Sequence, residues 1–284
     1  MAKKDNGTRV RDALRATAEL PDPASSPVGP GKKDKGEKKL ATAGERLDAL
    51  QEALYAEGQP GPDGRSVLLV LQGMDTSGKG GTVRHVLGLV NPMGVRYKGF
   101  KVPTPAERRH DFLWRVRKEL PAAGQIGVFD RSHYEDVLVP RVSGLLSAAE
   151  RRRRITQINA FEKEVAAAGT TIVKVFLHIS PEEQLRRLVA RLERPEKIWK
   201  FAPSDVEARD HWHAYAQAYA ELLERTSTDH APWFVVPADR KWYRNWAVAE
   251  LLIETLTEMA PRFPEPHFDV AEQLAKLKGD GVGA

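Results

Sequence analysis

Short runs of apolar residues alternate along this chain with stretches in which apolar side chains recur every three or four positions. The short runs are rich in Val, Ile, Leu and Phe, as the buried strands of parallel sheets are. They predict five strands: Val67–Leu71, Val95–Val102, Gln125–Asp130, Thr171–Ile179 and Trp233–Val236. Because helical patterns separate these strands, the order indicates an α/β fold of three layers with a five-stranded parallel sheet.

The segments between the strands carry start and stop signals of helices. Four of them open with a Ser or Thr three positions before a Glu, a pairing that satisfies free N–H groups at a helix start: Thr104, Ser147, Ser180 and Ser204. The expected helices are Leu40–Glu57, Val83–Val90, one from Thr104 to Pro121, a short one after His133, Ala149–Ala168, one from Ser180, one from Ser204 to Leu223, and Trp242–Met259. No internal repeat is evident, so we expect one domain over residues 40–262.

The two ends of the chain differ from this middle part. Met1–Lys39 is rich in Pro, Gly, Ser and Lys and poor in large apolar residues, which predicts a flexible basic arm. Its lysine cluster could gather a polyanion, but a solvated tail is the simpler interpretation. Residues 263–284 are interpreted as a C-terminal tail.

Composition and charge narrow the class of protein. The 284 residues include no cysteine, which excludes disulfides, thiolate metal sites and cysteine nucleophiles. Met1–Leu20 is polar and charged, unlike a signal peptide, and no apolar run approaches the ~20 residues that span a bilayer. We therefore expect a cytoplasmic protein without membrane association. The net charge of +5 favours anionic partners such as nucleotides, nucleic acid or inorganic phosphate chains.

A glycine-rich loop directly follows the first predicted strand. It contains Gly73, Gly78, Gly80 and Gly81, with Lys79 directly after Gly78. Glycines let backbone N–H groups turn inward around an anion, and the following helix adds its positive N-terminal end. The pattern G-x-x-x-x-G-K between a strand and a helix predicts a P-loop, or Walker A motif, with these glycines and the lysine as phosphate-binding residues.

Two acidic residues are candidates for holding a divalent metal ion. The Ser or Thr that commonly binds Mg²⁺ after the P-loop lysine is replaced here by Gly80, so a metal needs other ligands. Asp75 lies inside the loop, and Asp130 ends the third predicted strand, where an acid can face bound phosphates. We predict a Mg²⁺ site at these two carboxylates, with Mn²⁺ as a second candidate ion. A turn-capping role for Asp75 is the alternative.

Arginines near these elements are candidates for contacting phosphate. Arg131 follows Asp130 at the carboxyl edge of the sheet, where a guanidinium can bind phosphate oxygens with two parallel N–H donors. An Asp-Arg pair could also form a plain turn. Arg115 lies between Trp114 and Val116 in the predicted helix from Thr104, and we weigh phosphate binding there against a solvated basic face.

A basic segment beyond the fourth strand interrupts the helical pattern with two prolines. This stretch, RLERPEKIWKFAP, includes Arg191, Lys197 and Lys200. A hinged basic segment is typical of a lid that closes over phosphates and excludes water, so we predict a lid over about residues 191–212. An ordinary surface loop is the alternative.

Several motifs together resemble those of the polyphosphate kinase 2 family, in the family's order and over roughly Leu40–Pro261: GMDTSGKGGT, HDFLWR, FDRSHYEDVLVPRV, RPEKIWKF and APWFVVPADRKWYRNWAVA. The resemblance implies a thymidylate-kinase-like fold, Mg²⁺, and phosphoryl transfer between inorganic polyphosphate and a nucleotide. It also implies a homo-oligomer, either a dimer or a tetramer. Catalytic roles are carried over to Asp75, Lys79, Asp130, Arg131 and Arg191.

The tetrad HYED at residues 133–136 is similar to the subgroup that accepts AMP as well as ADP, and it makes Glu135 the candidate for nucleotide selectivity. We therefore expect reversible transfer from polyphosphate to AMP, ADP or both, with guanine nucleotides left open. A nucleotide phosphate has a second pKa of about 6, so the acceptor is anionic near neutrality and no general base is demanded.

Two other functions are compatible with the residues. An ATP-dependent nucleoside-monophosphate kinase would use the same loop without polyphosphate. A polyanion-binding or nucleic-acid-binding module with an inactive loop would bind DNA or RNA in a salt-sensitive way. The sequence contains no recognition-helix or RNA-binding signature, so we expect no specific nucleic acid partner.

Overall fold

A sheet of five parallel strands forms the centre of the computed structural model, which describes residues 8–59, 61 and 64–279. The spatial order is β2-β3-β1-β4-β5, and every neighbouring pair is parallel. The strands are β1 (Ser66–Gln72), β2 (Val95–Gly99), β3 (Ile126–Asp130), β4 (Thr170–His178) and β5 (Trp233–Pro237). The five predicted strands are confirmed, with ends that differ by a few residues.

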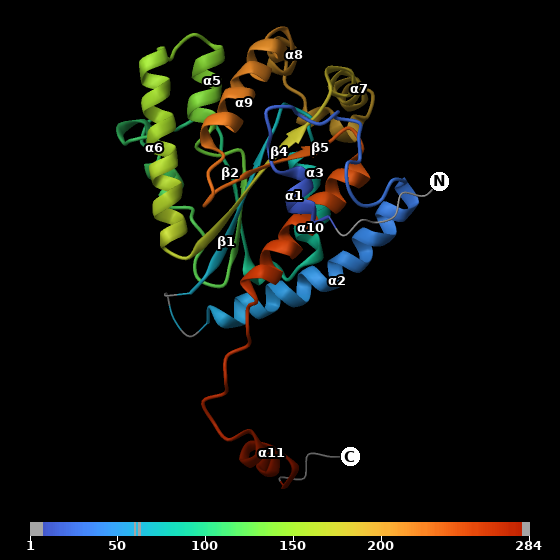
Figure 1. The fold of residues 1–284 in the computed structure, drawn as a ribbon, viewed down its shortest axis with the longest axis vertical. Coiled ribbons are helices and arrows are strands. Elements are labelled where there is room, and N and C mark those ends of the chain that lie inside the picture. The colour runs from blue at the N-terminus through green and yellow to red at the C-terminus, as the bar shows by residue number, and fades with distance from the viewer. Residues whose placement is uncertain (1–7, 60, 62–63, 280–284) are drawn as a thin grey trace.

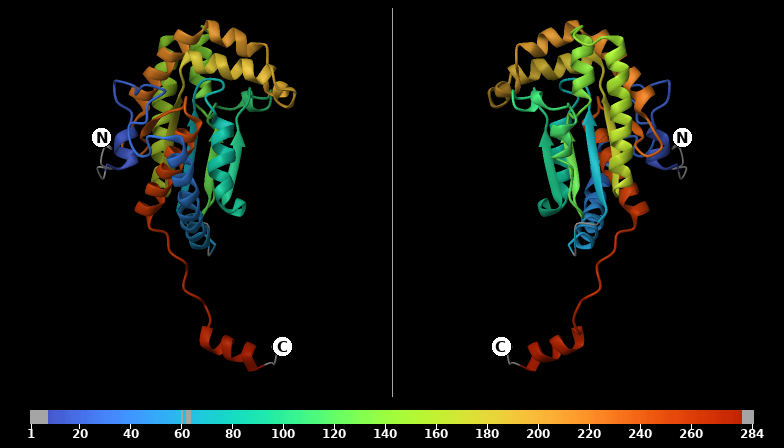
Figure 2. Two further views of the ribbon diagram at one scale, coloured as in Figure 1. Left: turned by 90° about the vertical axis from the view of Figure 1, so that its right-hand side faces the viewer. Right: turned by 90° about the vertical axis from the view of Figure 1, so that its left-hand side faces the viewer.

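The central strand β1 is buried along its whole length because helices cover both faces of the sheet (Figure 1, Figure 2). Side chains alternate across a strand. Val67, Leu69 and Leu71 therefore pack into one core, whereas Leu68 and Val70 pack into the other. Burial on both sides explains why this strand is a continuous apolar run in the sequence.

Helices in two groups cover the two faces and complete the three layers. On one face lie α1 (Val10–Leu14), α2 (Lys33–Glu57), α3 (Lys79–Val86) and α10 (Lys241–Met259). The opposite face carries α4 (Trp114–Arg117), α5 (Glu135–Val142), α6 (Ala148–Ala167) and α9 (Trp212–Thr226). None of the helices in the described part of the chain is both long and apolar enough to cross a membrane.

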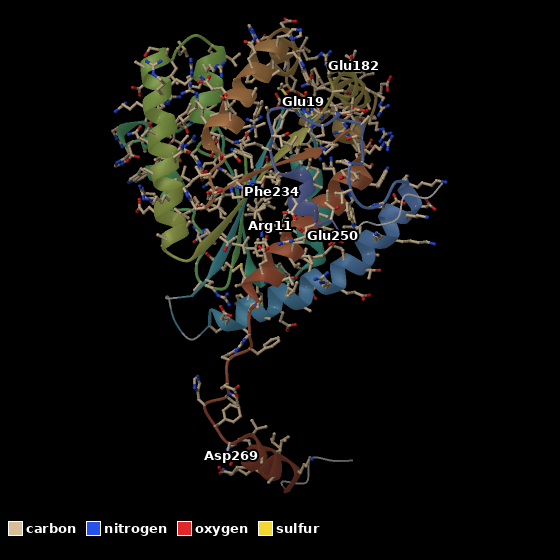
Figure 3. The ribbon with its side chains drawn as sticks, viewed as in Figure 1. Arg11, Glu19, Glu182, Phe234, Glu250 and Asp269 are labelled. Atoms are coloured by element: carbon tan, nitrogen blue, oxygen red, sulfur yellow. The ribbon has the colours of Figure 1, made fainter. Side chains whose placement is uncertain are left out.

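The remaining helices lie beyond the carboxyl end of the strands or apart from the sheet (Figure 1, Figure 3). Helices α7 (Pro181–Leu192) and α8 (Ser204–Asp210) lie beyond the carboxyl end. Short 3₁₀ turns are η1 (Leu87–Leu89), η2 (Pro92–Gly94), η3 (Glu107–Arg109) and η4 (Pro195–Lys200). Helix α11 (Val270–Gly279) falls in the predicted C-terminal tail and stands away from the rest of the chain.

The N-terminal region differs from the flexible arm predicted for residues 1–39, of which residues 1–7 lie outside the described residues. Helix α1 buries Val10 and Leu14 in the first core. Glu254 of α10 accepts hydrogen bonds from the N–H groups of Val10 and Arg11, at 2.7 and 2.9 Å. Helix α2 begins at Lys33, earlier than predicted. Two apolar anchors and one carboxylate thus order a segment whose composition indicates disorder.

Two predicted helices are each divided into two pieces. The capping box at Thr104 forms, since its N–H donates to Glu107 and its hydroxyl accepts from the Glu107 N–H. However, the backbone becomes extended at His110, and Asp111 starts α4 anew by accepting from the Leu113 N–H at 3.0 Å. The predicted helix from Ser204 is likewise interrupted after Asp210 and continues as α9.

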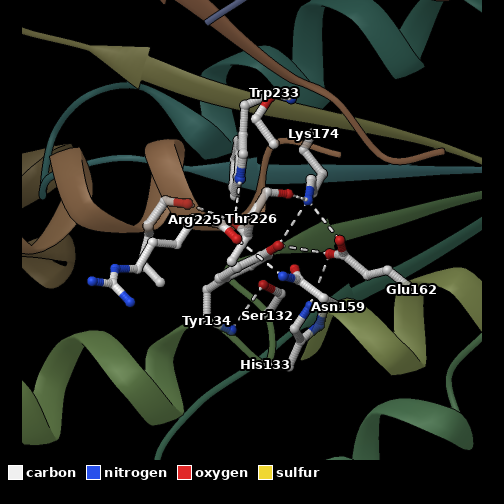
Figure 4. Close-up of polar contacts among 11 residues, drawn as sticks. Ser132, His133, Tyr134, Asn159, Glu162, Lys174, Arg225, Thr226 and Trp233 are labelled. Atoms are coloured by element: carbon white, nitrogen blue, oxygen red, sulfur yellow. Dashed lines mark hydrogen bonds and ion pairs between the residues drawn. The ribbon is translucent and has the colours of Figure 1, made fainter. Parts of the chain in front are cut away.

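A buried polar network joins β4 to the start of α5, the C-terminal half of α6 and the end of α9 (Figure 4). Lys174 donates to Glu162 at 2.6 Å, to the Tyr134 hydroxyl at 2.9 Å and to the Thr226 carbonyl at 2.7 Å. Glu162 also accepts from the Tyr134 hydroxyl at 2.7 Å and lies 3.2 Å from a ring nitrogen of His133. Burial opposes the charge of Glu162, but Lys174 and His133 outweigh it and hold its pKa below the ordinary value. The network fixes the backbone just before α5.

Removing the buried charge should cost far more stability than removing an exposed one on the same helix. Glu162→Gln leaves Lys174 without a counter-charge and should lower the free energy of unfolding by about 3–5 kcal/mol. The control is Glu164→Gln, whose ion pair with Arg117 at 2.8 Å is exposed and should contribute under ~1 kcal/mol. Urea titration of both variants measures the difference, and equal losses would contradict the assignment.

The same network predicts the direction of the acid response. A carboxylate whose folded-state pKa is lowered contributes its full stability above the unfolded value of about 4.3. That contribution is lost as the pH falls through the lowered pKa of folded Glu162. The Glu162→Gln variant should therefore show a smaller loss of stability over this acidic range than the parent chain does.

Candidate functional site

The loop between β1 and α3 has the backbone geometry of an anion cradle. Gly73 (φ 151°) and Gly78 (φ 109°) adopt angles that favour glycine, and Thr76 (φ 64°) is left-handed despite its branched side chain. A residue in this region costs roughly 1–3 kcal/mol and persists only where surrounding contacts hold it, as they often do in functional loops. The backbone therefore turns as a phosphate-binding loop does.

Buried guanidinium groups from two other helices hold the carbonyl oxygens of this loop. Arg187 of α7 donates to the carbonyl oxygens of Thr76 at 2.8 Å and Ser77 at 3.0 Å. Arg244 of α10 donates to the same Ser77 oxygen at 3.3 Å. These bonds fix the carbonyl side of the loop, and the Ser77 N–H donates within the loop to the Met74 carbonyl at 3.1 Å.

The first residues of α3 complete the cradle. The N–H groups of Lys79, Gly80 and Gly81 precede the first helical hydrogen bond, and these residues line a cleft together with Gly78. The Lys79 ammonium donates to the carbonyl oxygens of Gly73 at 2.7 Å and Met74 at 3.2 Å. Burial lowers the pKa of Lys79, and Asp75 opposes this shift.

The two predicted acidic ligands line the same cleft. Asp130 ends β3 opposite Leu71 of β1, and Asp75 follows β1 in the loop. Asp75 accepts a hydrogen bond from Arg131 at 3.0 Å. Asp130 accepts from the Tyr97 hydroxyl at 3.5 Å. The parallel register of β1 and β3 thus brings the two carboxylates to one wall of the cleft.

These carboxylates suit a hard cation that binds together with phosphate. Within the described ranges, no group of three or more His, Cys, Asp or Glu side chains could hold a metal ion. Mg²⁺ commonly takes only one or two carboxylates and completes its shell with water and substrate phosphate oxygens. Asp75 and Asp130 fit that pattern, and their metal role stays a prediction.

Arg131 and Glu135 follow β3 and interact electrostatically near the loop. Arg131 has a left-handed backbone (φ 65°) and is half-exposed. Glu135 begins α5, where burial raises its pKa while Arg131 and Lys79 act in the opposite direction. The amide of Gln72 lies between Ser132 and Glu135, and it donates to Glu135 at 3.0 Å when its nitrogen faces that carboxylate.

Residues of the predicted lid also line the cleft, whose volume is about 870 Å³. Arg191, Lys197 and Lys200 line it from α7 and η4. Arg191 donates to the Lys200 carbonyl at 3.2 Å and to Asp205 of α8 at 3.4 Å. One cleft therefore contains most of the candidate residues: Asp75, Gly78, Lys79, Gly80, Gly81, Asp130, Arg131, Arg191, Lys197 and Lys200.

Arg115 lies elsewhere. Its guanidinium donates to Asp136 at 2.9 Å and to the Lys101 carbonyl at 2.8 Å. It lines a separate cavity of about 330 Å³ near α4 and α6. The structure thus does not bring Arg115 to the phosphate cradle. We interpret the buried pair with Asp136 as a link between α4 and α5.

Other cations in the cleft were not among the candidates: Arg84, Lys101, Arg187, Arg194, Lys241 and Arg244. Lys241 and Arg244 open the helix that follows β5, so the rule that ligands bind beyond the carboxyl ends of strands could have indicated them. Burial, with a contribution from Arg187, lowers the pKa of Arg244 to about 9. In the described part of the chain Arg244 has no carboxylate partner and donates instead to Asn245 and Ser77.

Two glycines of the loop should respond differently to alanine. A Cβ atom on Gly78 would lie 1.7 Å from the Arg244 guanidinium, on a backbone with φ 109°, whereas a Cβ on Gly80 meets nothing within 4 Å. Gly78→Ala should lower the free energy of unfolding by about 1–3 kcal/mol from backbone strain alone, and the clash with Arg244 should add to this loss. Gly80→Ala, in the first turn of α3, should leave it unchanged or raise it by up to ~1 kcal/mol. Thermal unfolding compares them, and a parent-like midpoint for Gly78→Ala would refute the packing argument.

Comparisons with known proteins identify the family of this chain. Residues 31–264 match the family model described as Polyphosphate kinase 2. The AMP/ADP-polyphosphate phosphotransferase of Meiothermus ruber is 48% identical over 245 residues, which cover 86% of this chain and 90% of that protein. The ADP-polyphosphate phosphotransferase of Rhodopseudomonas palustris is 41% identical over 80% of this chain and 81% of its own length.

A solved structure shows the same fold over nearly the whole chain. The crystal structure of polyphosphate kinase 2 from Arthrobacter aurescens TC1 superimposes with a TM-score of 0.92 and 47% identity, covering 96% of this chain and 97% of that one. The matched region of the family model runs from the start of α2 to the end of α10 and so includes every wall of the cleft. The resemblance noted in the motifs is therefore confirmed, and the chain belongs to the polyphosphate kinase 2 family.

Proposed function

We propose that this chain transfers a phosphoryl group reversibly between inorganic polyphosphate and adenine nucleotides, with both AMP and ADP as acceptors. One observation carries the proposal: among the described residues, eleven Lys and Arg side chains line the cleft against three Asp. One nucleotide does not require so many cations, whereas two polyanions that must react with each other do. The printed names of the relatives from Meiothermus ruber and Rhodopseudomonas palustris support the same chemistry.

The residues of the cleft suit a reaction that depends on charge compensation and alignment. The acceptor phosphate is already anionic near neutrality because its second pKa is about 6, so no side chain has to remove a proton. Lys79 and Arg131 would offset the charge that spreads over the transferred phosphoryl group. Arg191 would approach the same group from the lid, whose closure excludes water.

We propose Mg²⁺ as the cofactor, with Mn²⁺ able to replace it, at Asp75 and Asp130. The bound ion would neutralise phosphate charge and orient the reacting oxygens. The hydrogen bond from Arg131 to Asp75 keeps that carboxylate at the edge of the cleft.

Selection between AMP and ADP is assigned to Glu135. Its carboxylate lies beside Arg131 and Lys79, so it weakens the positive potential that the acceptor phosphates meet. AMP and ADP differ by one phosphate group and therefore respond differently to that potential. The relative named AMP/ADP-polyphosphate phosphotransferase supports acceptance of both nucleotides.

The cellular setting and assembly are also part of the proposal. We place the chain in the cytoplasm because its N-terminal sequence does not resemble a signal peptide. On the strength of the family resemblance we propose a homo-oligomer, a dimer or a tetramer. Guanine nucleotides stay open as acceptors, and no specific nucleic acid or membrane partner is included.

Transfer should be observed when the protein is mixed with Mg²⁺, polyphosphate and either AMP or ADP, and the products ADP and ATP are measured. Asp75→Asn and Lys79→Ala should each lower kcat by at least ~10²-fold, since each removes one preorganised charge from the reacting group. Lys163→Ala, an exposed lysine on α6, is the control and should keep parental turnover. No product from either nucleotide, or transfer that requires ATP as donor, would overturn the proposal.

Removal of the metal tests the cofactor separately. Chelation with EDTA should abolish transfer, and added Mg²⁺ or Mn²⁺ should restore it. Asp130→Asn removes one negative ligand, so the Mg²⁺ concentration that gives half-maximal rate should rise at least ~10-fold. Full activity in EDTA, or an unchanged Mg²⁺ requirement in Asp130→Asn, would show that the two aspartates do not serve a metal.

A further inference from the structure

A second cavity, the outer groove, is continuous with the cleft. Its volume is about 460 Å³, and it shares Arg187, Ala190, Arg194 and Lys241 with the cleft. These shared residues belong to α7, to the segment after it, and to the first turn of α10. An extended anion that leaves the cleft between α7 and α10 therefore enters the outer groove directly.

The outer groove carries more positive charge than its own carboxylates neutralise. Over the described residues, its lining holds six cations against Glu183 and Asp239: Lys33, Arg186, Arg187, Arg194, Arg240 and Lys241. Glu183 pairs with Arg186 and Arg187 at once. Asp239 accepts from the N–H and the hydroxyl of Ser180 at 2.9 and 2.8 Å. Both of its carboxylate oxygens therefore bind the N-cap residue of α7.

Lys241 lies at the junction of the cleft and the outer groove, and the excess of positive charge there affects its pKa. Burial lowers its pKa most, and the other contributions also lower it, since they come from Arg187, Arg244, Lys197 and Arg194. Like charges that crowd in this way make the protonated lysine unfavourable. An anion bound at the junction would relieve the repulsion.

The start of α2 is fixed at the rim of the groove. A Cβ atom on Gly36 would lie 2.3 Å from the Trp242 ring, so only a glycine allows this close approach. The contact places Lys33, the first residue of α2, beside the first turn of α10. The backbone of one member of the N-terminal lysine cluster thus has a defined position at the groove, although the Lys33 side chain stays largely exposed and pairs with Glu37 at 3.7 Å.

We propose that the outer groove binds the distal part of a polyphosphate chain whose reacting end lies in the cleft, with Lys33, Arg186 and Arg240 as its outer contacts. This inference rests on the proposed function. A polyphosphate carries about one negative charge on every phosphate, so a long chain can place charge in both cavities at once. A chain of a few phosphates fills only the cleft.

The lining favours a bare phosphate chain over a nucleic acid. Single-stranded nucleic acids are bound by cations together with aromatic side chains on which bases stack. Among the described residues of the groove lining, the aromatic side chain is that of Trp242, and its ring is packed against Gly36. The groove therefore offers charge without a free stacking surface.

The test compares long and short polyphosphate chains as donors. In the full-length triple variant Lys33→Gln/Arg186→Gln/Arg240→Gln, the KM for chains of several tens of phosphates should rise about 10-fold, since three charge contacts are lost. The kcat at saturation and the KM for chains of a few phosphates should not change. The control is Arg152→Gln/Lys163→Gln/Lys278→Gln, which removes the same charge from exposed positions on α6 and α11 and should keep the long-chain KM.

Direct binding separates this inference from the proposed function. With an end-labelled long polyphosphate and no nucleotide, the triple variant should bind more weakly than the control, and its affinity should depend less steeply on salt concentration. If the triple variant keeps the parental KM and affinity for long chains, the proposal that the outer groove binds polyphosphate is refuted, even if the parent enzyme is active. Equal losses for long and short chains would also overturn it, because the three cations would then act at the reacting end.

A competition experiment tests the class of ligand. Single-stranded RNA with the same number of phosphates should displace the labelled polyphosphate poorly. Equal displacement, weakened by the same three substitutions, would assign the groove to nucleic acid and contradict the proposal. Absence of transfer by the parent enzyme would refute the proposed function alone, since the binding measurement does not depend on turnover.

Discussion

The hydrogen bonds from buried guanidinium groups to backbone carbonyl oxygens are the interaction on which the rest of the site depends. Arg187 and Arg244 both donate to carbonyl oxygens of the loop, and a carbonyl dipole satisfies a donor without cancelling its charge. Arg187 is also paired with Glu183, whereas Arg244 has no carboxylate partner among the described residues. Burial lowers the pKa of Arg187 to about 10 and that of Arg244 to about 9, so both stay protonated at neutral pH. The positive charge of Arg244 therefore remains available to an anion, and the bonds from both arginines set the curvature of the loop.

A buried lysine on the other side of the sheet differs from Arg244, because a carboxylate of the protein neutralises its charge. Lys174 has a carboxylate partner in Glu162 and further acceptors for its protons, so its charge is neutralised within the protein. This network supports the start of α5, and with it the position of Glu135. A neutral buried network gives rigidity, whereas the cleft keeps its charge unbalanced for substrate.

The parts of the fold that depend on local sequence patterns could be predicted from the sequence. Apolar runs identified all five strands, and the strand, glycine loop and helix together located the cradle. The prediction of a flexible N-terminal arm was wrong because burial of Val10 and Leu14 is a tertiary effect that composition does not show. Arg115 was misplaced because an isolated helical position does not reveal which carboxylate will reach it. Arg187 was overlooked because arginine on a helix normally indicates a solvated face, and nothing local shows that it turns inward. Arg244 was overlooked although its place in the helix after β5 could have indicated it.

The open space at Gly80 has an evolutionary consequence. No neighbouring atom obstructs a small side chain there, so steric fit does not explain why the chain lacks the hydroxyl that many P-loops use for Mg²⁺. One substitution would convert this loop to the commoner pattern without disturbing its backbone. At this position the chain thus differs from the commoner pattern in ligand chemistry and not in available space, and a mutational path to that pattern remains sterically accessible.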